Sequence, residues 1–140
     1  MGMDVYGQCP KNKAGEYFRA NCWSWRPIHS IMEECHDGII DEETMIGMSF
    51  NDGAGLKTDS ECQGLAWEME LFLHKMEHHD NFSIDAGMEV EVARTEHGGH
   101  RFVPDGNPEG VETMSAYNVS REHVMEFVTF LRNCGGFEVW

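Results

Sequence analysis

The sequence has few basic residues. Lysine and arginine together number 10 among 140 residues, against 25 aspartates and glutamates, which leaves a formal net charge of −15. No local cluster of Lys and Arg interrupts this acidity. Because a duplex nucleic acid is held by basic groups that neutralise its phosphates, we expect no binding to duplex nucleic acid. The acidity either keeps the chain soluble or suits a basic partner protein.

Long hydrophobic runs and paired cysteines are also missing. No window approaches the roughly 18 apolar residues of a transmembrane helix, and the N-terminal MGMDVYG has neither a basic nor an apolar stretch typical of a secretory signal. The five cysteines are odd in number and form no Cys-x-x-Cys pair, which argues against a disulfide framework or a zinc ribbon. We therefore expect a cytoplasmic protein with free thiols and no contact with a membrane.

Motifs for phosphate binding and nucleophilic catalysis are absent from the sequence. There is no Gly-x-Gly-x-x-Gly motif and no nucleophile elbow. Asn51-Asp52-Gly53 resembles a fragment of a calcium loop, but Met48 and Phe50 occupy positions that require oxygen ligands. We interpret this segment as a structural turn and expect no cofactor.

Hydrophobic periodicity and capping signals predict three helices. The first is predicted over residues 27–36, because Pro27 suits a first helical turn. The second is predicted over residues 61–79, with Ser60 as its cap and Gln63 completing a capping box. The third follows the Ser120 cap and ends at Gly135-Gly136.

Short strands are expected between these helices. They are predicted over residues 3–7, 88–92, 101–103 and 137–140, and the second and third form a hairpin. The mixed order of helices and strands is typical of the α+β class. The length of 140 residues suits a single compact domain, residues 1–140, with about three helices packed on a small, largely antiparallel sheet.

The second predicted helix has apolar residues on both sides. Its core stripe and the edge of that stripe comprise Cys62, Leu65, Met69, Phe72, Met76, Ala66 and Leu73. At about 100° per residue, the opposite side carries Trp67, Leu71, His74 and His78. Either a loop or strand covers this side, or it is a contact surface for another protein, including a second copy of the chain.

His74, Glu77 and His78 match the His-x-x-Glu-His pattern of zinc hydrolases. Two histidines four residues apart on one helix can share a zinc ion while the glutamate activates a bound water. However, the chain contains eight histidines, so chance matches are easy, and the motif lies at the end of its predicted helix. We predict no metal site, and His97 and His100 would join one only if their hairpin folded onto this helix.

The segment GEYFRANCWSWRP, residues 15–27, concentrates aromatic and arginine side chains. If residues 15–25 are extended, alternation places Tyr17, Arg19, Asn21, Trp23 and Trp25 on one face, next to Arg26. Such a group can stack on a planar ligand and bind its charge, or it can anchor a protein contact. Alternatively, the aromatic rings fill the core while the arginines pair with carboxylates of the chain itself.

Four blocks of the sequence resemble a family of small, uncharacterised phage and bacterial proteins. The blocks are MGMDVYG, GEYFRANCWSWRP, NDGAGL and EFVTFLRNCGGFEVW. The resemblance implies that the aromatic and arginine residues of the second block belong to the framework of the family, but it implies no activity. Longer members carry Cys-x-x-Cys pairs where this chain has residues 88–103, so a zinc role does not extend to this sequence.

These observations favour a non-enzymatic, acidic interaction protein, phage-encoded and directed at a host factor. The first alternative is a protein that binds a small nucleotide-like ligand through Arg19, Trp23, Trp25 and Arg26. The second is a metal-dependent hydrolase that uses His74, Glu77 and His78.

Overall fold

The fold is of the α+β class, as the sequence predicts. The computed structural model describes residues 2–84, 103–104 and 117–140. Its elements are β1 (Gly2–Gly7), a 3-10 turn η1 (Lys13–Gly15), β2 (Tyr17–Asn21), α1 (Cys22–Cys35), α2 (Glu42–Gly47), α3 (Asp59–Lys75), β3 (Asn81–Ser83), β4 (Val103–Pro104), β5 (Asn118–Ser120), α4 (Arg121–Cys134) and β6 (Phe137–Val139). None of the described helices combines the length and apolar character that a membrane crossing requires.

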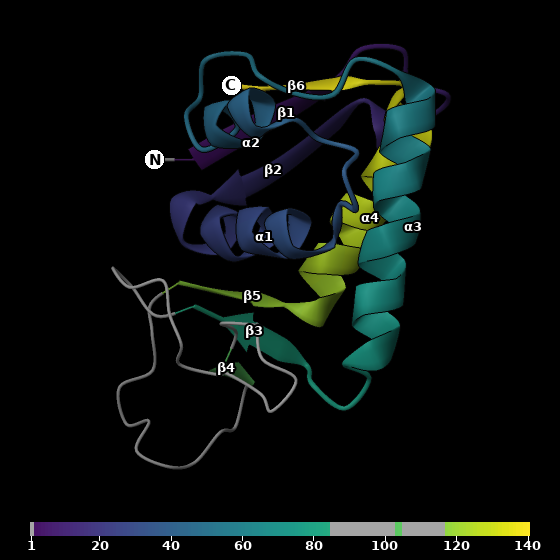
Figure 1. Cartoon of the computed structure of the whole chain (residues 1–140). Helices are drawn as coiled ribbons and strands as arrows, with labels where there is room; N and C mark the ends of the chain where they lie inside the picture. The colour runs from purple at the N-terminus through teal and green to yellow at the C-terminus, as the bar shows by residue number, and fades with distance from the viewer. Residues whose placement is uncertain (1, 85–102, 105–116) are drawn as a thin grey trace.

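Two small antiparallel sheets lie on either side of α1. The larger has the strand order β2-β1-β6, and the smaller has the order β4-β3-β5. Helices α1 and α4 pack on one face of the larger sheet, and α3 packs along α4 (Figure 1). The larger sheet therefore has a helix-covered face and an opposite, outer face. The predicted strand at residues 88–92 and the hairpin leading from it up to residue 102 lie outside the described residues.

The core is centred on five aromatic rings from four elements. Phe18 of β2 lies 5.0 Å from Phe127 of α4, ring centre to ring centre, and Trp25 of α1 meets the same ring edge-on at 5.7 Å. Phe130 and the β6 residue Phe137 lie 6.1 and 6.2 Å from Phe127. All five side chains are buried. Burial of each large apolar side chain contributes about 1.5–3 kcal/mol, so this cluster is a major source of stability.

Helix α1 begins five residues before the predicted start. Asn21 is its N-cap, and the side-chain oxygen of Asn21 accepts a hydrogen bond from the Ser24 backbone amide at 2.9 Å. The predicted start at Pro27 was wrong because this cap satisfies the first helical amides earlier. Pro27 instead lies inside the helix, where it has no amide to donate to the Trp23 carbonyl.

Helix α3 also begins earlier than predicted and ends earlier. Thr58, not Ser60, is the N-cap and accepts from the Glu61 amide at 3.1 Å. At the other end, the guanidinium group of Arg121 donates to the carbonyl oxygens of Leu73, Met76 and His79. These contacts satisfy carbonyl groups at and beyond the end of the helix, so α3 stops at Lys75 rather than near His79.

Helix α4 confirms the prediction for the third helix. Ser120 accepts from the His123 amide at 3.1 Å, and Gly135 adopts the left-handed conformation at φ 65° that terminates the helix. Six side chains of α4 are buried: Val124, Phe127, Val128, Phe130, Leu131 and Cys134. The short helix α2 was not predicted; its N-cap is Asp41, whose side chain accepts from the Thr44 amide at 2.7 Å.

The turn η1 is tightly packed against the end of α4. A Cβ atom at Gly15 would lie 1.9 Å from the carbonyl oxygen of Asn133, which is backbone and cannot rotate away. The segment that leads into β2 can therefore pack against α4 only with a glycine at position 15.

We expect Gly15→Ala to lower the free energy of unfolding by about 2 kcal/mol or more, because the backbone must shift. Chemical denaturation monitored by tryptophan fluorescence measures this loss. Gly64→Ala in α3 is the matched control, since the nearest atom there is the flexible Ile39 Cδ1 at 3.1 Å. Alanine should be neutral or stabilising at that helical position. If the two variants were equally stable, the close approach of Gly15 to the Asn133 carbonyl would be contradicted.

Candidate functional site

The aromatic and arginine residues of the segment 15–27 do not form one surface. Tyr17 and Arg19 lie on the outer face of the larger sheet, Asn21 caps α1, and Trp23, Trp25 and Arg26 belong to α1. The predicted common face is wrong because the chain changes from strand to helix at Cys22. Side chains two residues apart then no longer point the same way.

Arg19 is held by the protein itself. Its guanidinium Nη1 donates to Asp4 Oδ1 at 2.7 Å, and the Tyr17 hydroxyl donates to the same oxygen at 2.5 Å. The hydrogen bond from Tyr17, followed by the charge of Arg19, lowers the pKa of Asp4. A Cβ atom at Gly2 would lie 2.5 Å from Arg19 Nη2, so the absence of a side chain there leaves room for the guanidinium.

Arg26 and Trp23 both contact Tyr117. The Trp23 and Tyr117 rings lie 4.9 Å apart, and Arg26 Cζ lies 4.8 Å from the centre of the Tyr117 ring. Trp23 remains 48% exposed. Trp25, by contrast, is a core residue whose indole nitrogen donates to the Met48 carbonyl at 2.9 Å. Both arginines of the segment therefore interact with side chains of the protein.

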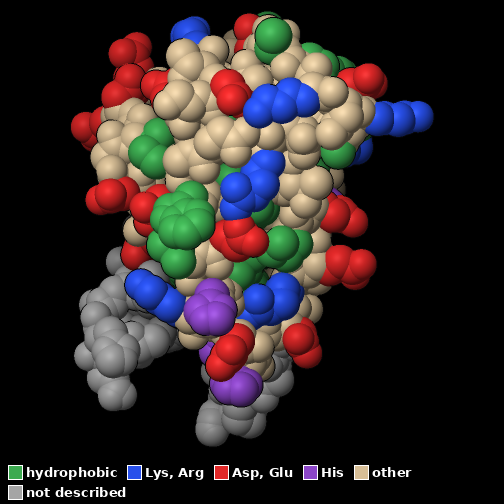
Figure 2. All heavy atoms as spheres, turned by 90° about the vertical axis from the view of Figure 1, so that its right-hand side faces the viewer, with side chains coloured by type: hydrophobic (Ala, Val, Ile, Leu, Met, Phe, Trp, Pro, Cys, Tyr) green, Lys and Arg blue, Asp and Glu red, His purple; other side chains and the backbone are tan. Residues whose placement is uncertain are grey.

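The outer side of α3 carries exposed hydrophobic side chains. Trp67 is 58% exposed and Leu71, one turn later, is 39% exposed. Figure 2 shows hydrophobic side chains gathered midway along this side of the molecule, with acidic and basic groups around them and histidines below. His74 and His78 are also exposed. Among the residues that the structure describes, no loop or strand covers Trp67 and Leu71.

The His-x-x-Glu-His pattern is not on one helical face. Because α3 ends at Lys75, His74 lies in the helix while Glu77 and His78 follow it. Glu77 Oε2 and His78 Nε2 lie 3.6 Å apart, and both side chains are exposed. Within residues 2–84, 103–104 and 117–140, no three His, Cys, Asp or Glu side chains are grouped as metal ligands. His97 and His100 lie outside the described residues.

The cysteines are thiols, and the two deepest join α3 to α4. Cys62 and Cys134 are buried with their sulfur atoms 3.6 Å apart. Contact with Cys134, together with burial, raises the pKa of Cys62, and burial raises the pKa of Cys35 to about 12. Such protonated thiols are poor nucleophiles.

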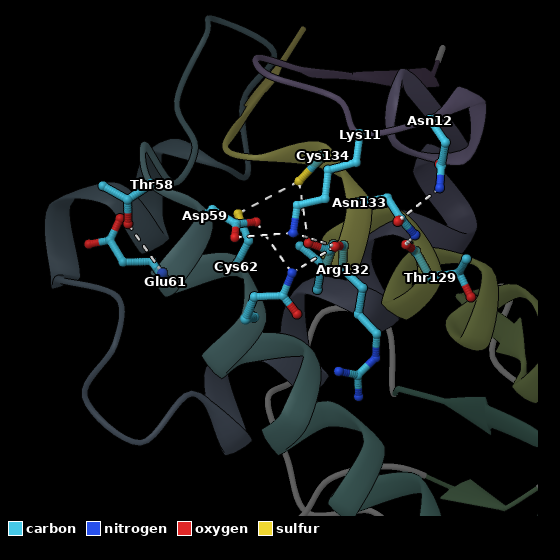
Figure 3. Close-up of polar contacts among 12 residues, drawn as sticks. Lys11, Asn12, Thr58, Asp59, Glu61, Cys62, Thr129, Arg132, Asn133 and Cys134 are labelled. Atoms are coloured by element: carbon cyan, nitrogen blue, oxygen red, sulfur yellow. Dashed lines mark hydrogen bonds and ion pairs between the residues drawn. The ribbon is translucent and has the colours of Figure 1, made fainter.

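Polar contacts surround the Cys62–Cys134 pair (Figure 3). Lys11 Nζ pairs with Asp59 at 3.2 Å, and Asn12 Nδ2 donates to Asn133 Oδ1 at 3.0 Å. These contacts tie the loop before η1 to the beginning of α3 and the end of α4. We interpret this region as structural.

Two surface features were not predicted from the sequence. One is a groove of about 480 Å³ between β2 and α4. The other is the pair Ile46 and Phe50 at α2, which are 55% and 58% exposed. Met45, Ile46 and Met48 make residues 45–48 largely apolar, which is the only sequence signal near the exposed pair. The groove depends on which strand lies at the sheet edge, and that order has no local sequence signal.

Comparisons of the chain with protein-family models, curated proteins and solved structures give no match.

Tyr17→Phe should raise the pKa of Asp4 towards its ordinary value, because the hydrogen bond from the hydroxyl favours the ionised carboxylate. An NMR titration of the Asp4 carboxyl carbon measures this change. The native Asp4 pKa is below that of the unfolded chain, so the stabilisation is present above the unfolded pKa and is lost as the pH falls through the native value.

The wild type should therefore lose more stability on acidification than Tyr17→Phe. Tyr6→Phe is the matched control, because Tyr6 contacts the Tyr17 ring at 5.3 Å but does not donate to Asp4 in the structure. An Asp4 titration that responds to both variants alike would contradict the assignment.

Proposed function

We propose that the protein is a non-enzymatic interaction protein that binds a basic partner protein through the outer side of α3. The observation that carries this proposal is the exposure of Trp67 and Leu71 on adjacent turns. Tryptophan is enriched among the residues that dominate binding energy at protein interfaces. Exposed apolar side chains are unfavourable in water, so a partner that buries Trp67 and Leu71 would gain free energy.

The surface continues beyond these two side chains. Gly64 lies one turn before Trp67, and the Ile39 side chain approaches it. Ile39 is itself only partly buried. The contact surface therefore comprises Ile39, Gly64, Trp67 and Leu71, a largely apolar strip along α3 that can be buried by a complementary pocket.

The charges around this strip favour a basic partner. Helix α3 carries four carboxylates, at Asp59, Glu61, Glu68 and Glu70, against one lysine, Lys75. Two of the four are already paired within the protein, Asp59 with Lys11 and Glu70 with Arg132. A second copy of the chain would bring another charge of −15 to the same interface, and like charges oppose that association. A partner with Lys and Arg around an apolar pocket matches the strip in both chemistry and charge.

The sequence supports an origin and a cellular compartment for this interaction. The resemblance to phage and bacterial proteins supports a phage origin and a bacterial host protein as the partner. Five free thiols suit a reducing compartment, which supports the bacterial cytoplasm as the place where the two proteins meet.

The two alternatives have less support. A site for a nucleotide-like ligand would need Arg19, Trp23 and Trp25 together, but Arg19 pairs with Asp4 and Trp25 is in the core. A hydrolase would need His74 and His78 on one helix, but α3 ends between them.

Trp67→Ala/Leu71→Ala should weaken binding to the partner by about 2 kcal/mol or more, roughly a 30-fold loss of affinity. The wild-type protein is used to capture the partner from bacterial lysate. The partner is then identified, purified and titrated calorimetrically against each variant. Affinity should also fall with added salt, because opposite charges meet at the rim.

Ile46→Ala/Phe50→Ala is the matched control, since these two apolar side chains, in α2 and three residues after it, are at least as exposed as Leu71. It should retain wild-type affinity. Unchanged affinity of the α3 variant would contradict the proposal, as would a wild-type dimer in light scattering that the α3 variant converts to a monomer. The second result would identify the partner as another copy of the chain.

A further inference from the structure

The strand β2 lies at an edge of the larger sheet. The opposite edge, at β6, is paired with the segment at residues 53–56. There Phe137 and Val139 donate to the carbonyls of Leu56 and Ala54 at 2.8 Å, and Gly53 donates to Val139. The order β2-β1-β6 places no described strand beyond β2.

The register shows which backbone groups of β2 face outward. Asp4 exchanges hydrogen bonds with Trp140 on the β6 side, while the Gly7 amide donates to Glu16 on the β2 side. In an antiparallel ladder these directions alternate, so Phe18 and Ala20 bond to β1. Tyr17 and Arg19 then direct their amides and carbonyls away from the sheet. Neither residue has a backbone partner for these groups in the part of the chain that the structure describes.

The unpredicted groove lies along this edge. Its β2 side is formed by Tyr17, Phe18 and Arg19, and the remaining lining residues are Ala14 from η1 and Glu122, Met125, Glu126, Thr129 and Phe130 from α4. Residues 122, 125, 126 and 129 share one face of α4, because they are spaced three and four apart. The groove thus places a face of α4 beside backbone groups of β2 that have no partner among the described residues.

The residues that line the groove favour a ligand with apolar and basic side chains. Met125 supplies apolar surface, with the buried Phe18 and Phe130 beneath it. Glu122 and Glu126 supply two carboxylates, and Glu126 also contacts His123 of the same helix at 3.1 Å. The one cation among the groove residues is Arg19, and it is paired with Asp4. An extended segment laid beside β2 would direct alternate side chains towards α4, where the aliphatic stems of lysine or arginine can pack on Met125 while their charges reach the glutamates. The intervening apolar side chains would lie on the outer face, beside Tyr17.

We propose that the edge of β2 and the adjoining groove bind an extended segment of a partner protein, with alternating apolar and basic residues, by addition of a strand to the sheet. Backbone hydrogen bonds to Tyr17 and Arg19 supply affinity, and the α4 residues supply specificity. The site is separate from α3, so it does not depend on the function proposed above.

The test uses a fluorescent peptide of about ten residues, a typical strand length or longer, with alternating lysine and valine. Two matched peptides serve as controls. One replaces lysine with glutamate, and the other keeps the lysine-valine sequence but carries N-methyl groups on alternate residues, which removes backbone donors. Fluorescence anisotropy gives the affinity of each peptide for the whole chain.

We expect the lysine-valine peptide to bind about tenfold or more tightly than either control. In NMR hydrogen exchange, peptide binding should slow exchange of the Tyr17 and Arg19 amides. The Phe18 and Ala20 amides already bond to β1 and should change less. Glu122→Gln/Glu126→Gln should weaken binding severalfold, while Glu42→Gln/Glu43→Gln, the same charge change in the first turn of α2, should not.

Several results would overturn the proposal. One is equal affinity of the N-methylated peptide, which would leave only non-specific charge attraction. Another is protection that falls on α3 rather than on Tyr17 and Arg19. No binding at about 1 mM peptide would also overturn it. So would concentration-dependent protection of Tyr17 and Arg19 without peptide, because β2 would then pair with a second copy of the chain.

Discussion

The aromatic packing around Phe127 is the interaction on which the rest of the structure depends. Phe127 contacts rings from β2 and α1, in the first quarter of the chain, and from β6, near its C-terminus. These contacts hold α1 and α4 against one face of the larger sheet. The position of α4 in turn fixes α3, which packs along it and is joined to it by Cys62, Cys134 and the guanidinium of Arg121.

The surfaces available for binding follow from this arrangement. Because the helices gather on one face of the larger sheet, β2 remains at an edge with α4 beside it (Figure 1). Because α3 is the outermost helix, its side away from α4 meets solvent. Most of its apolar residues face inward, and Trp67 and Leu71 are the exceptions. The arginines of the segment 15–27, in contrast, stabilise the fold through Asp4 and Tyr117.

Local signals predicted the elements with strong caps and clear periodicity. Ser120 and Gly135 bounded α4 correctly, and the period of α3 placed Trp67 opposite the core. The starts of α1 and α3 were misplaced because a capping residue earlier in the chain begins each helix. Helix α1 begins directly after its cap Asn21 rather than at Pro27, and α3 begins after Thr58 rather than after Ser60.

The remaining features depend on tertiary contacts that no local pattern encodes. The extended run predicted for residues 15–25 ended at Cys22, which moved Trp25 from a candidate site into the core. Pairing of Arg19 with Asp4 requires the register of β1 and β2. The groove beside β2 requires the strand order, which is set by the return of β6 to β1.

Photo-crosslinking from position 71 tests the central claim most directly. A photoreactive amino acid replaces Leu71 on α3 in one protein and Phe50 near α2 in another, and each is irradiated in bacterial cells. We expect a covalent adduct from position 71 to a partner rich in lysine and arginine, and none from position 50. An adduct from position 50 alone, or an adduct of position 71 with a second copy of the chain, would contradict a basic partner at α3.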